Sequence, residues 1–239
     1  MTALYPVFLK LEGLPVVVVG GGLVAAGKLD GLMTAGARVT VVAPQITQAI
    51  KARTDVSLVE REFIASDLDG ARWVVAAAPP EINQQVAAAA TARGLFVNAV
   101  DDTASATAYL GGVVRRHSRA AATATATATA TVDGAGDGDS ARTPSDGAVV
   151  EIAISTRGVA PALAGLLREA LDALLPDDLE SWIEVAKSER IAWKRAGIPM
   201  AQRRPLLLAA LNRIYAPAED KRPFLLRAID RLYPNGWSA

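Results

Sequence analysis

The stretch Pro15-Val-Val-Val-Val-Gly20-Gly-Gly22-Leu-Val-Ala25 carries a run of valines into a segment rich in leucine and alanine. The valines predict a buried strand, and Leu23 to Ala35 has the composition and spacing of a helix. The glycines between them fit the pattern G-x-G-x-x-G/A, in which glycine permits a tight turn and lets the backbone approach a pyrophosphate. Free N–H groups at the start of the helix would attract that pyrophosphate.

We therefore expect a dinucleotide to bind at the glycine turn, and the alternative is a tight turn with a structural role alone. The residues expected to contact the dinucleotide are Gly20, Gly21, Gly22, Leu23 and Val24, with Ala43 and Pro44 at the end of the second expected strand. A carboxylate that holds the ribose hydroxyls usually stands at that strand end, and its absence leaves NAD and NADP undecided by this position. Arg38 lies at the opposite end of the strand, which favours NAD slightly.

The first hundred residues repeat the same alternation of strand-like and helix-like segments. Further strands are expected at residues 38–43, 56–62, 73–77 and 95–99, with helices at 46–52 and 82–92. Strands that are apolar on both faces and separated by helices predict a parallel sheet covered on each side. The fold class is therefore α/β, with a doubly wound Rossmann sheet.

The pattern changes after residue 100. Residues 107–115 and 148–155 look like two strands joined without a helix, and the connection contains Ala-Thr repeats from Ala122 to Thr131. Such low-complexity sequence predicts a disordered insertion at a hairpin tip, to which we assign no chemistry, and the alternative is a weak β-ribbon of alternating Ala and Thr. From Pro161 the chain is expected to be helical, at residues 162–174, 178–196, 201–215 and 218–232. These elements predict a second, smaller α+β module followed by helices.

Composition excludes several classes of protein. The chain has no Cys, which rules out disulfides, thiolate zinc sites and cysteine nucleophiles. Its 25 Lys and Arg balance its 25 Asp and Glu, which argues against a dedicated nucleic-acid binder. The longest apolar stretch, residues 14–26, is too short to span a membrane and lacks the cationic segment that precedes a signal-peptide core. We expect a cytoplasmic protein.

Two adjacent carboxylates follow the last strand of the expected sheet, in Asn98-Ala-Val-Asp101-Asp102. Open α/β sheets place their ligand crevice at the carboxyl ends of the strands. A carboxylate there could accept a proton or hold a ligand nitrogen. Alternatively, Asp101 or Asp102 caps the following turn.

Four motifs together resemble a known family. Val19-Gly-Gly-Gly22, Gly36-Ala-Arg-Val-Thr-Val-Val-Ala-Pro44, Asn98-Ala-Val-Asp101 and Ala153-Ile-Ser-Thr-Arg-Gly-Val-Ala-Pro161 occur in the order found in siroheme synthases. The resemblance is to their precorrin-2 dehydrogenase/sirohydrochlorin ferrochelatase module and covers about residues 3–215, apart from the insertion. It implies an NAD-binding Rossmann domain at 1–106, a dimerisation module at 107–175 with the insertion at about 119–147, and a helical domain at 176–239.

The resemblance also implies an activity. Members oxidise precorrin-2 to sirohydrochlorin with NAD, and bifunctional members insert Fe²⁺ to give siroheme. The catalytic aspartate of the family falls on Asp101, as a general base. Asn98, Ser155 and Thr156 fall on substrate-binding positions, although Ser155 and Thr156 could equally cap the helix that begins near Pro161. The expected protein is a homodimer that binds a tetrapyrrole.

Basic residues cluster in the expected C-terminal helices, and a polycarboxylate substrate would need such cations. Between residues 185 and 215, Glu189 is the single acid among Lys187, Arg190, Lys194, Arg195, Arg203, Arg204 and Arg213. Arg203 and Arg204 are the candidates for substrate carboxylates, since arginine pairs with them bidentately. The alternative is a solvated helix face. Arg115, Arg116 and Arg119 form a second basic cluster that would also suit a polyanion. His117 beside them, the only histidine, is interpreted as an exposed turn residue, and no metal site is expected.

Departures from the family pattern keep a second function open. The family commonly has Arg where this chain has Gly27, and Thr-Asp-Asp where it has Ala78-Pro79-Pro80. These positions lie on the expected cofactor side. The alternative hypothesis is a non-catalytic Rossmann module that senses a dinucleotide or a tetrapyrrole. A third hypothesis, nucleic-acid binding by the basic helices, lacks interleaved aromatic residues and a reading motif.

Overall fold

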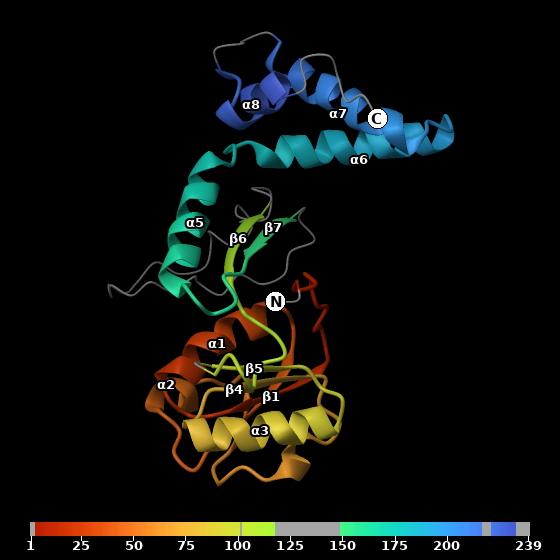
Figure 1. The fold of residues 1–239 in the computed structure, drawn as a ribbon. Coiled ribbons are helices and arrows are strands. Elements are labelled where there is room, and N and C mark those ends of the chain that lie inside the picture. Colours follow the sequence, from red (N-terminus) through yellow and green to blue (C-terminus); the bar gives the residue numbers. More distant parts are fainter. Residues whose placement is uncertain (1–2, 101, 118–148, 217–220, 233–239) are drawn as a thin grey trace. The chain divides into compact units, whose positions relative to one another are not determined.

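The computed structural model describes residues 3–100, 102–117, 149–216 and 221–232 (Figure 1). Its chain divides into two compact units. The first unit contains residues up to Gly111 together with Ser155–Ala160, and the second contains the described residues from Gly112 to Ile154 and from Pro161 onward.

The first unit is built on a five-stranded parallel sheet. Its strands are β1 (Pro15–Val19), β2 (Arg38–Val42), β3 (Ser57–Val59), β4 (Trp73–Ala76) and β5 (Val97–Ala99), in the order β3-β2-β1-β4-β5. The helical segments are α1 (Leu23–Thr34), α2 (Gln48–Lys51), η1 (Ala65–Leu68) and α3 (Pro80–Ala92). From β1 the strand order runs outward in both directions, through β2 to β3 on one side and through β4 to β5 on the other. The predicted doubly wound α/β sheet is therefore confirmed.

Alternating residues of β1 divide the core into two layers. Val16 and Val18 pack with residues of α1 and α2 on one face, and Val17 and Val19 pack with residues of α3 and η1 on the other. Figure 1 shows α1 and α3 on opposite faces of the sheet. Because the central strands are buried on both faces, their sequence is continuously apolar instead of alternating.

The second unit begins with an antiparallel hairpin. Strands β6 (Gly112–His117) and β7 (Val149–Ile154) pair with Val114 opposite Ile152, and α5 (Pro161–Leu174) packs against β6. A Cβ atom on Gly112 would lie 3.0 Å from the carbonyl oxygen of Ala164, so glycine permits this close approach of strand and helix. The predicted Ala-Thr insertion lies outside the described residues.

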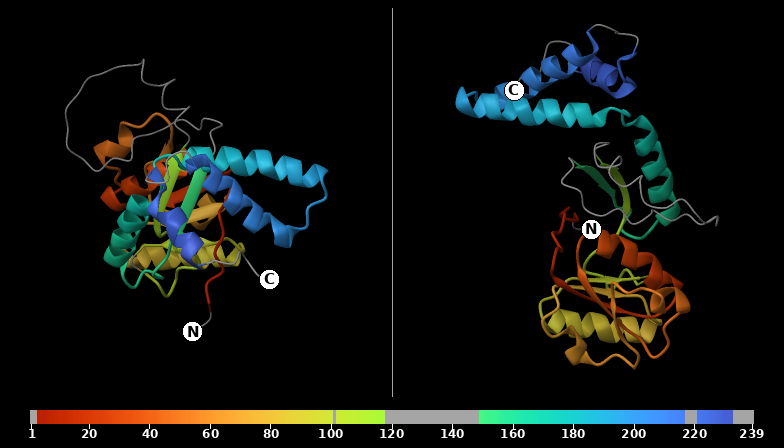
Figure 2. Two further views of the ribbon diagram at one scale, coloured as in Figure 1. Left: turned by 90° about the horizontal axis from the view of Figure 1, so that it is seen from above. Right: turned by 180° about the vertical axis from the view of Figure 1, so that it is seen from behind.

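Three further helices follow, α6 (Leu179–Arg195), α7 (Met200–Tyr215) and α8 (Phe224–Leu232). Both views of Figure 2 show α6 and α7 side by side. Their core contains Leu179, Trp182, Leu211, Tyr215 and Leu226. Among the described helices, none combines the length and the apolar character that crossing a bilayer requires.

One predicted strand was wrong at its start. Residues 107–111 were expected to open the hairpin, but β6 begins only at Gly112. Thr107 and Ala108 instead both donate backbone hydrogen bonds of 3.0 Å to the carbonyl oxygen of Val97, and the Thr107 hydroxyl accepts one from the Val97 N–H. This segment therefore belongs to the first unit, where it returns beside β5.

Candidate functional site

The glycine turn after β1 is folded against the end of β4. Gly20 has a φ of +128°, and a Cβ atom there would lie 2.1 Å from the carbonyl oxygen of Ala77. The N–H of Gly20 also donates a 2.9 Å hydrogen bond to the carbonyl of Val42 at the end of β2. Position 20 therefore requires glycine for two reasons, the positive φ and the lack of space for a side chain.

Gly21 makes a second close approach, to the segment that follows β2. A Cβ atom on Gly21 would lie 2.1 Å from the carbonyl oxygen of Gln45, and the Gly21 carbonyl accepts a 2.9 Å hydrogen bond from Thr47. The turn thus closes on the ends of β2 and β4 at once. Ala43 is buried behind it, while Pro44 is exposed.

Gly22 differs from its two neighbours because it faces open space. It is the N-cap of α1, and a Cβ atom on it would meet nothing within 4 Å. No side chain caps the helix, and its first turn contains no acidic residue. Leu23 and Val24 are 79% and 50% exposed. The helix start is therefore open to an anion, and the residues present fit the pyrophosphate of a dinucleotide.

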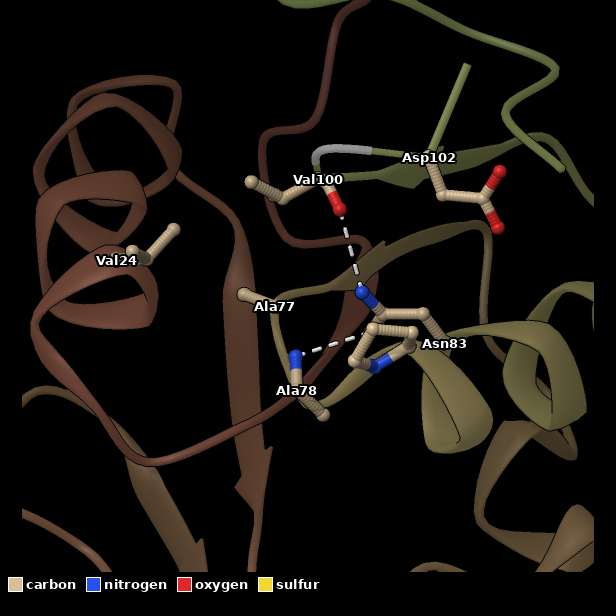
Figure 3. A pocket seen from close by; sticks show the side chains of 7 residues that line it. Val24, Ala77, Ala78, Asn83, Val100 and Asp102 are labelled. Carbon is tan, nitrogen blue, oxygen red and sulfur yellow. Dashed lines mark hydrogen bonds between the residues drawn. The ribbon is translucent and has the colours of Figure 1, made fainter. Parts of the chain in front are cut away.

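A cavity of about 160 Å³ lies beside this helix start. It is lined by Val24, Ala77, Ala78, Pro80, Asn83, Val100 and Asp102 (Figure 3). These residues come from α1, from the chain after β4, from α3 and from the chain after β5. The cavity thus occupies the carboxyl edge of the sheet, where open α/β folds bind their ligands.

Asn83 ties two of these segments together and was not identified from the sequence. Its side-chain oxygen accepts a 2.9 Å hydrogen bond from the Ala78 N–H, and its amide nitrogen donates one of 3.3 Å to the Val100 carbonyl. Residues 83, 86, 87 and 90 form the buried stripe of α3. A polar residue on a stripe with helical spacing was the available signal, because buried amides must find partners.

The second of the two adjacent aspartates accepts hydrogen bonds from the turn that follows it. The Asp102 carboxylate accepts 3.1 Å hydrogen bonds from the N–H groups of Ala104 and Ser105. Hydrogen bonding from Ser105, by its side chain first and then its backbone, lowers the pKa of Asp102. Asp102 therefore caps this turn. Asp101, the predicted general base, lies outside the described residues.

Asn98 is 7% exposed, and its amide nitrogen donates a 3.1 Å hydrogen bond to the Ala108 carbonyl. Its side-chain oxygen has no hydrogen-bond partner within the described part of the chain. The bond to Ala108 holds the returning segment against β5. Contact between Asn98 and substrate remains a prediction.

The loop that carries Ser155 and Thr156 belongs to the first unit. Ser155 accepts a 3.2 Å hydrogen bond at its hydroxyl from Arg157, and Arg157 and Gly158 have left-handed φ values of 57° and 74°. A Cβ atom on Gly158 would lie 3.0 Å from the Thr103 side chain. The structure therefore brings this loop against the chain that follows Asp102, and Ser155 bonds within its own turn.

The predicted carboxylate-binding arginines belong to the second unit and are not among the residues that this cavity brings together. The half-buried Arg203 donates a 3.0 Å hydrogen bond to the Ile198 carbonyl, whereas Arg204 is exposed on α7. Arg115 and Arg116 pair with Glu151 at 2.8 Å and with Asp172 at 3.0 Å. Both arginines of the second basic cluster that the structure describes are therefore paired with carboxylates, while Arg119 lies outside the described residues.

Arg38 was judged to be poorly placed for a 2′-phosphate, and its contact agrees with that interpretation. It donates a 2.9 Å hydrogen bond to the carbonyl of Gly13, at the amino end of β1. The glycine turn lies at the carboxyl end of the same strand.

Comparison with known proteins agrees with this architecture. A family model described as "Putative NAD(P)-binding" matches residues 7–112. The sequence predicts NAD as the cofactor, and this match to an NAD(P)-binding family supports a nicotinamide dinucleotide.

Curated siroheme synthases match most of the chain. The enzyme from Photorhabdus laumondii is 33% identical over 215 residues, which are 88% of this chain and 39% of that protein. The enzyme from Actinobacillus pleuropneumoniae is 32% identical over 203 residues, or 83% and 35%. The chain thus spans less than two fifths of the length of these relatives.

A solved structure named "SirC, precorrin-2 dehydrogenase" shares the fold, with a TM-score of 0.54 at 19% identity, over 96% of this chain and 98% of that one. The chain is therefore similar to siroheme synthases over most of its length, and its residues 7–112 match a model of an NAD(P)-binding family.

Proposed function

We propose that this protein oxidises precorrin-2 to sirohydrochlorin, with NAD as the oxidant, in siroheme biosynthesis. One observation carries the proposal: Val24, in the first turn of α1 after the open N-cap Gly22, lines the same cavity as Val100 and Asp102, which flank Asp101 in sequence. In this proposal the dinucleotide would bind at the same edge of the sheet as the loop that contains Asp102. Similarity to siroheme synthases and to the fold of a precorrin-2 dehydrogenase supports the choice of substrate.

The roles of the residues follow from this arrangement. The glycine turn would hold the pyrophosphate through backbone N–H groups at the start of α1. Bound NAD supplies a two-electron acceptor that takes a hydride from the substrate. The substrate also loses one proton, which the Asp101 carboxylate accepts and then releases to water. Ser155 and Thr156 would bind substrate carboxylates from the loop that packs against the chain after Asp102.

Cations of the helical region would bind the remaining carboxylates of the tetrapyrrole. Arg203 and Arg204 lie at the start of α7. Arg190, Lys194 and Arg195 of α6 are exposed, and none of these three has an ion-pair partner within the described residues. Such exposed cations on α6 suit capture of a polyanion, because no carboxylate of the described residues competes for them.

Insertion of Fe²⁺ into sirohydrochlorin is the second activity that we propose, with Fe²⁺ as a substrate. Within the described residues, no three His, Asp or Glu side chains gather as metal ligands would. Metal insertion requires a base for the pyrrole protons, and Asp101 would serve again. Accelerated incorporation of Fe²⁺ or Co²⁺ into sirohydrochlorin, measured against the spontaneous rate, tests this activity by itself.

We also propose that the protein is a homodimer joined through its second unit. Leu163, Leu166, Leu167 and Leu174 of α5 are between 42% and 64% exposed. An apolar surface of this kind is typical of protein interfaces. Light scattering should show a dimer for the wild type and a monomer for Leu166→Glu, whereas a monomeric wild type would refute the proposal.

The decisive experiment supplies purified protein with precorrin-2 and NAD and follows the absorbance of sirohydrochlorin and NADH. The Asp101→Asn variant should lose turnover and still bind NADH. The Asp102→Asn variant should keep turnover, because it retains an oxygen that can accept the turn-capping hydrogen bonds. If Asp102→Asn loses turnover and Asp101→Asn does not, the base is Asp102. A wild type that binds NADH and tetrapyrrole without turnover would support the sensor hypothesis instead.

A further inference from the structure

We propose that Asn83 is a positioning residue for the dehydrogenation, which fixes the backbone that carries Asp101 relative to the dinucleotide site. This inference rests on the proposed function. The oxygen of the Asn83 amide bonds to the segment after β4, and its nitrogen bonds to the segment after β5 (Figure 3). The segment after β4 borders the glycine turn, and the segment after β5 continues directly into Asp101.

The orientation of the Asn83 amide is fixed by its partners. The Ala78 N–H can only donate, so the side-chain atom facing it must be the oxygen. The Val100 carbonyl can only accept, so the atom facing it must be the NH₂ group. An asparagine can satisfy both demands at once, which neither an aspartate anion nor an aliphatic residue can do.

Burial makes these two bonds consequential. Asn83 is 3% exposed, beside Val86 and Ala87 on the face of α3 that packs against the sheet. Water cannot readily replace a buried partner, so each lost bond leaves an unsatisfied backbone group. The Val100 N–H donates a 2.9 Å hydrogen bond to the Ala76 carbonyl. The Val100 carbonyl has Asn83 as its single hydrogen-bond donor among the described residues.

The connection to chemistry runs through adjacent backbone atoms. The Val100 carbonyl belongs to the peptide group that joins Val100 to Asp101, so a shift of that group moves the base. The Ala78 N–H follows Ala77, whose carbonyl oxygen limits the space at Gly20. Asn83 would thus fix the peptide group that leads into Asp101 relative to the glycine turn, and a misplacement of about 1 Å in a catalytic group can cost roughly 100-fold in rate.

Two variants separate the two bonds. Asn83→Asp keeps an acceptor for Ala78 and loses the donor to Val100, so kcat should fall about 10- to 100-fold while the KM for NAD changes less than about twofold. Asn83→Ser is too short to reach either partner, so kcat should fall and the KM for NAD should rise. Rates are normalised to folded protein by circular dichroism, and Asn83→Ser also decides the matter if Asn83→Asp does not fold.

The pH profile supplies a readout that a purely structural role would not move. Once protonated, the carboxyl introduced by Asn83→Asp can donate to Val100 again, so the kcat of this variant relative to wild type should recover as the pH falls through the pKa of the new carboxyl. Asp102 is the single titratable side chain among the described residues that line this cavity. It is present in both proteins, so its titration contributes to the pH profile of each.

Gln84→Glu is the matched control, because Gln84 is exposed on the same helix and acquires the same charge. It should retain the wild-type kcat and pH profile. Equal kcat for Asn83→Asp and Gln84→Glu, or a ratio to wild type that does not change with pH, would overturn the inference while the proposed function stands. Absence of turnover in the wild type would overturn the proposed function and this inference together.

Discussion

A Cβ atom on residue 20 would lie 2.1 Å from the carbonyl oxygen of Ala77, so the first glycine of the turn is in contact with the end of β4. Gly20→Ala should therefore destabilise the first unit by about 3 kcal/mol or more, because the backbone must move and the φ of +128° is strained for alanine. Urea unfolding followed by circular dichroism measures this change. A stability within about 0.5 kcal/mol of wild type would contradict the packing described.

Gly22→Ala should separate binding from folding. The backbone of Gly22 is extended, and an added Cβ atom meets nothing within 4 Å, so the free energy of unfolding should change by at most about 1 kcal/mol, the difference between glycine and alanine as an N-cap. The methyl group would stand at the open helix start and should weaken NADH binding roughly tenfold. Fluorescence titration of NADH tests this, and unchanged affinity would argue for a purely structural turn.

The strands of the first unit were predictable because each is short, apolar and separated from the next by a helix. The same reasoning failed at residues 107–111, where the sequence looks like part of a hairpin but pairs beside β5. Strand-like composition identifies an extended chain, whereas the choice of neighbour depends on tertiary contacts such as the hydrogen bond from Val97 to Thr107.

The candidate site was predictable only where a local motif marks it. The glycine turn has a sequence pattern, and so does the pair of aspartates after β5. The sequence does not say which of the two aspartates caps the following turn, and the structure assigns that role to Asp102. Asn83 has no motif of its own, because its function depends on two backbone groups that are distant in sequence and meet at the sheet edge. Arg116 belongs to a basic cluster in the sequence, but it pairs with Asp172, which lies 56 residues away on α5 and could not be identified from the sequence.

The exposed cations of α6 make a prediction about substrate capture. Replacing both Arg190 and Lys194 by glutamine should raise the KM for the tetrapyrrole about 3- to 10-fold and leave kcat unchanged, because uniform binding is lost. The difference from wild type should shrink at high salt, as screening weakens attraction between exposed charges. Lys187→Gln is the control, since Lys187 pairs with Glu184 at 2.8 Å. An equal effect of the control would indicate a general charge effect and not a binding surface.

Tyr215 should make the helical region sensitive to alkali. Burial, followed by its 2.6 Å hydrogen bond to Asp178, raises the pKa of Tyr215 to about 12. In the unfolded chain the phenol ionises near pH 10, so its contribution is fully present below about pH 10 and is lost as the pH rises through about 12, by roughly 3 kcal/mol in all. Urea unfolding of wild type and Tyr215→Phe across this range isolates the effect, because other alkaline titrations are common to both. The two stabilities should converge as the pH rises, and a constant difference between them would show that Tyr215 keeps an ordinary pKa.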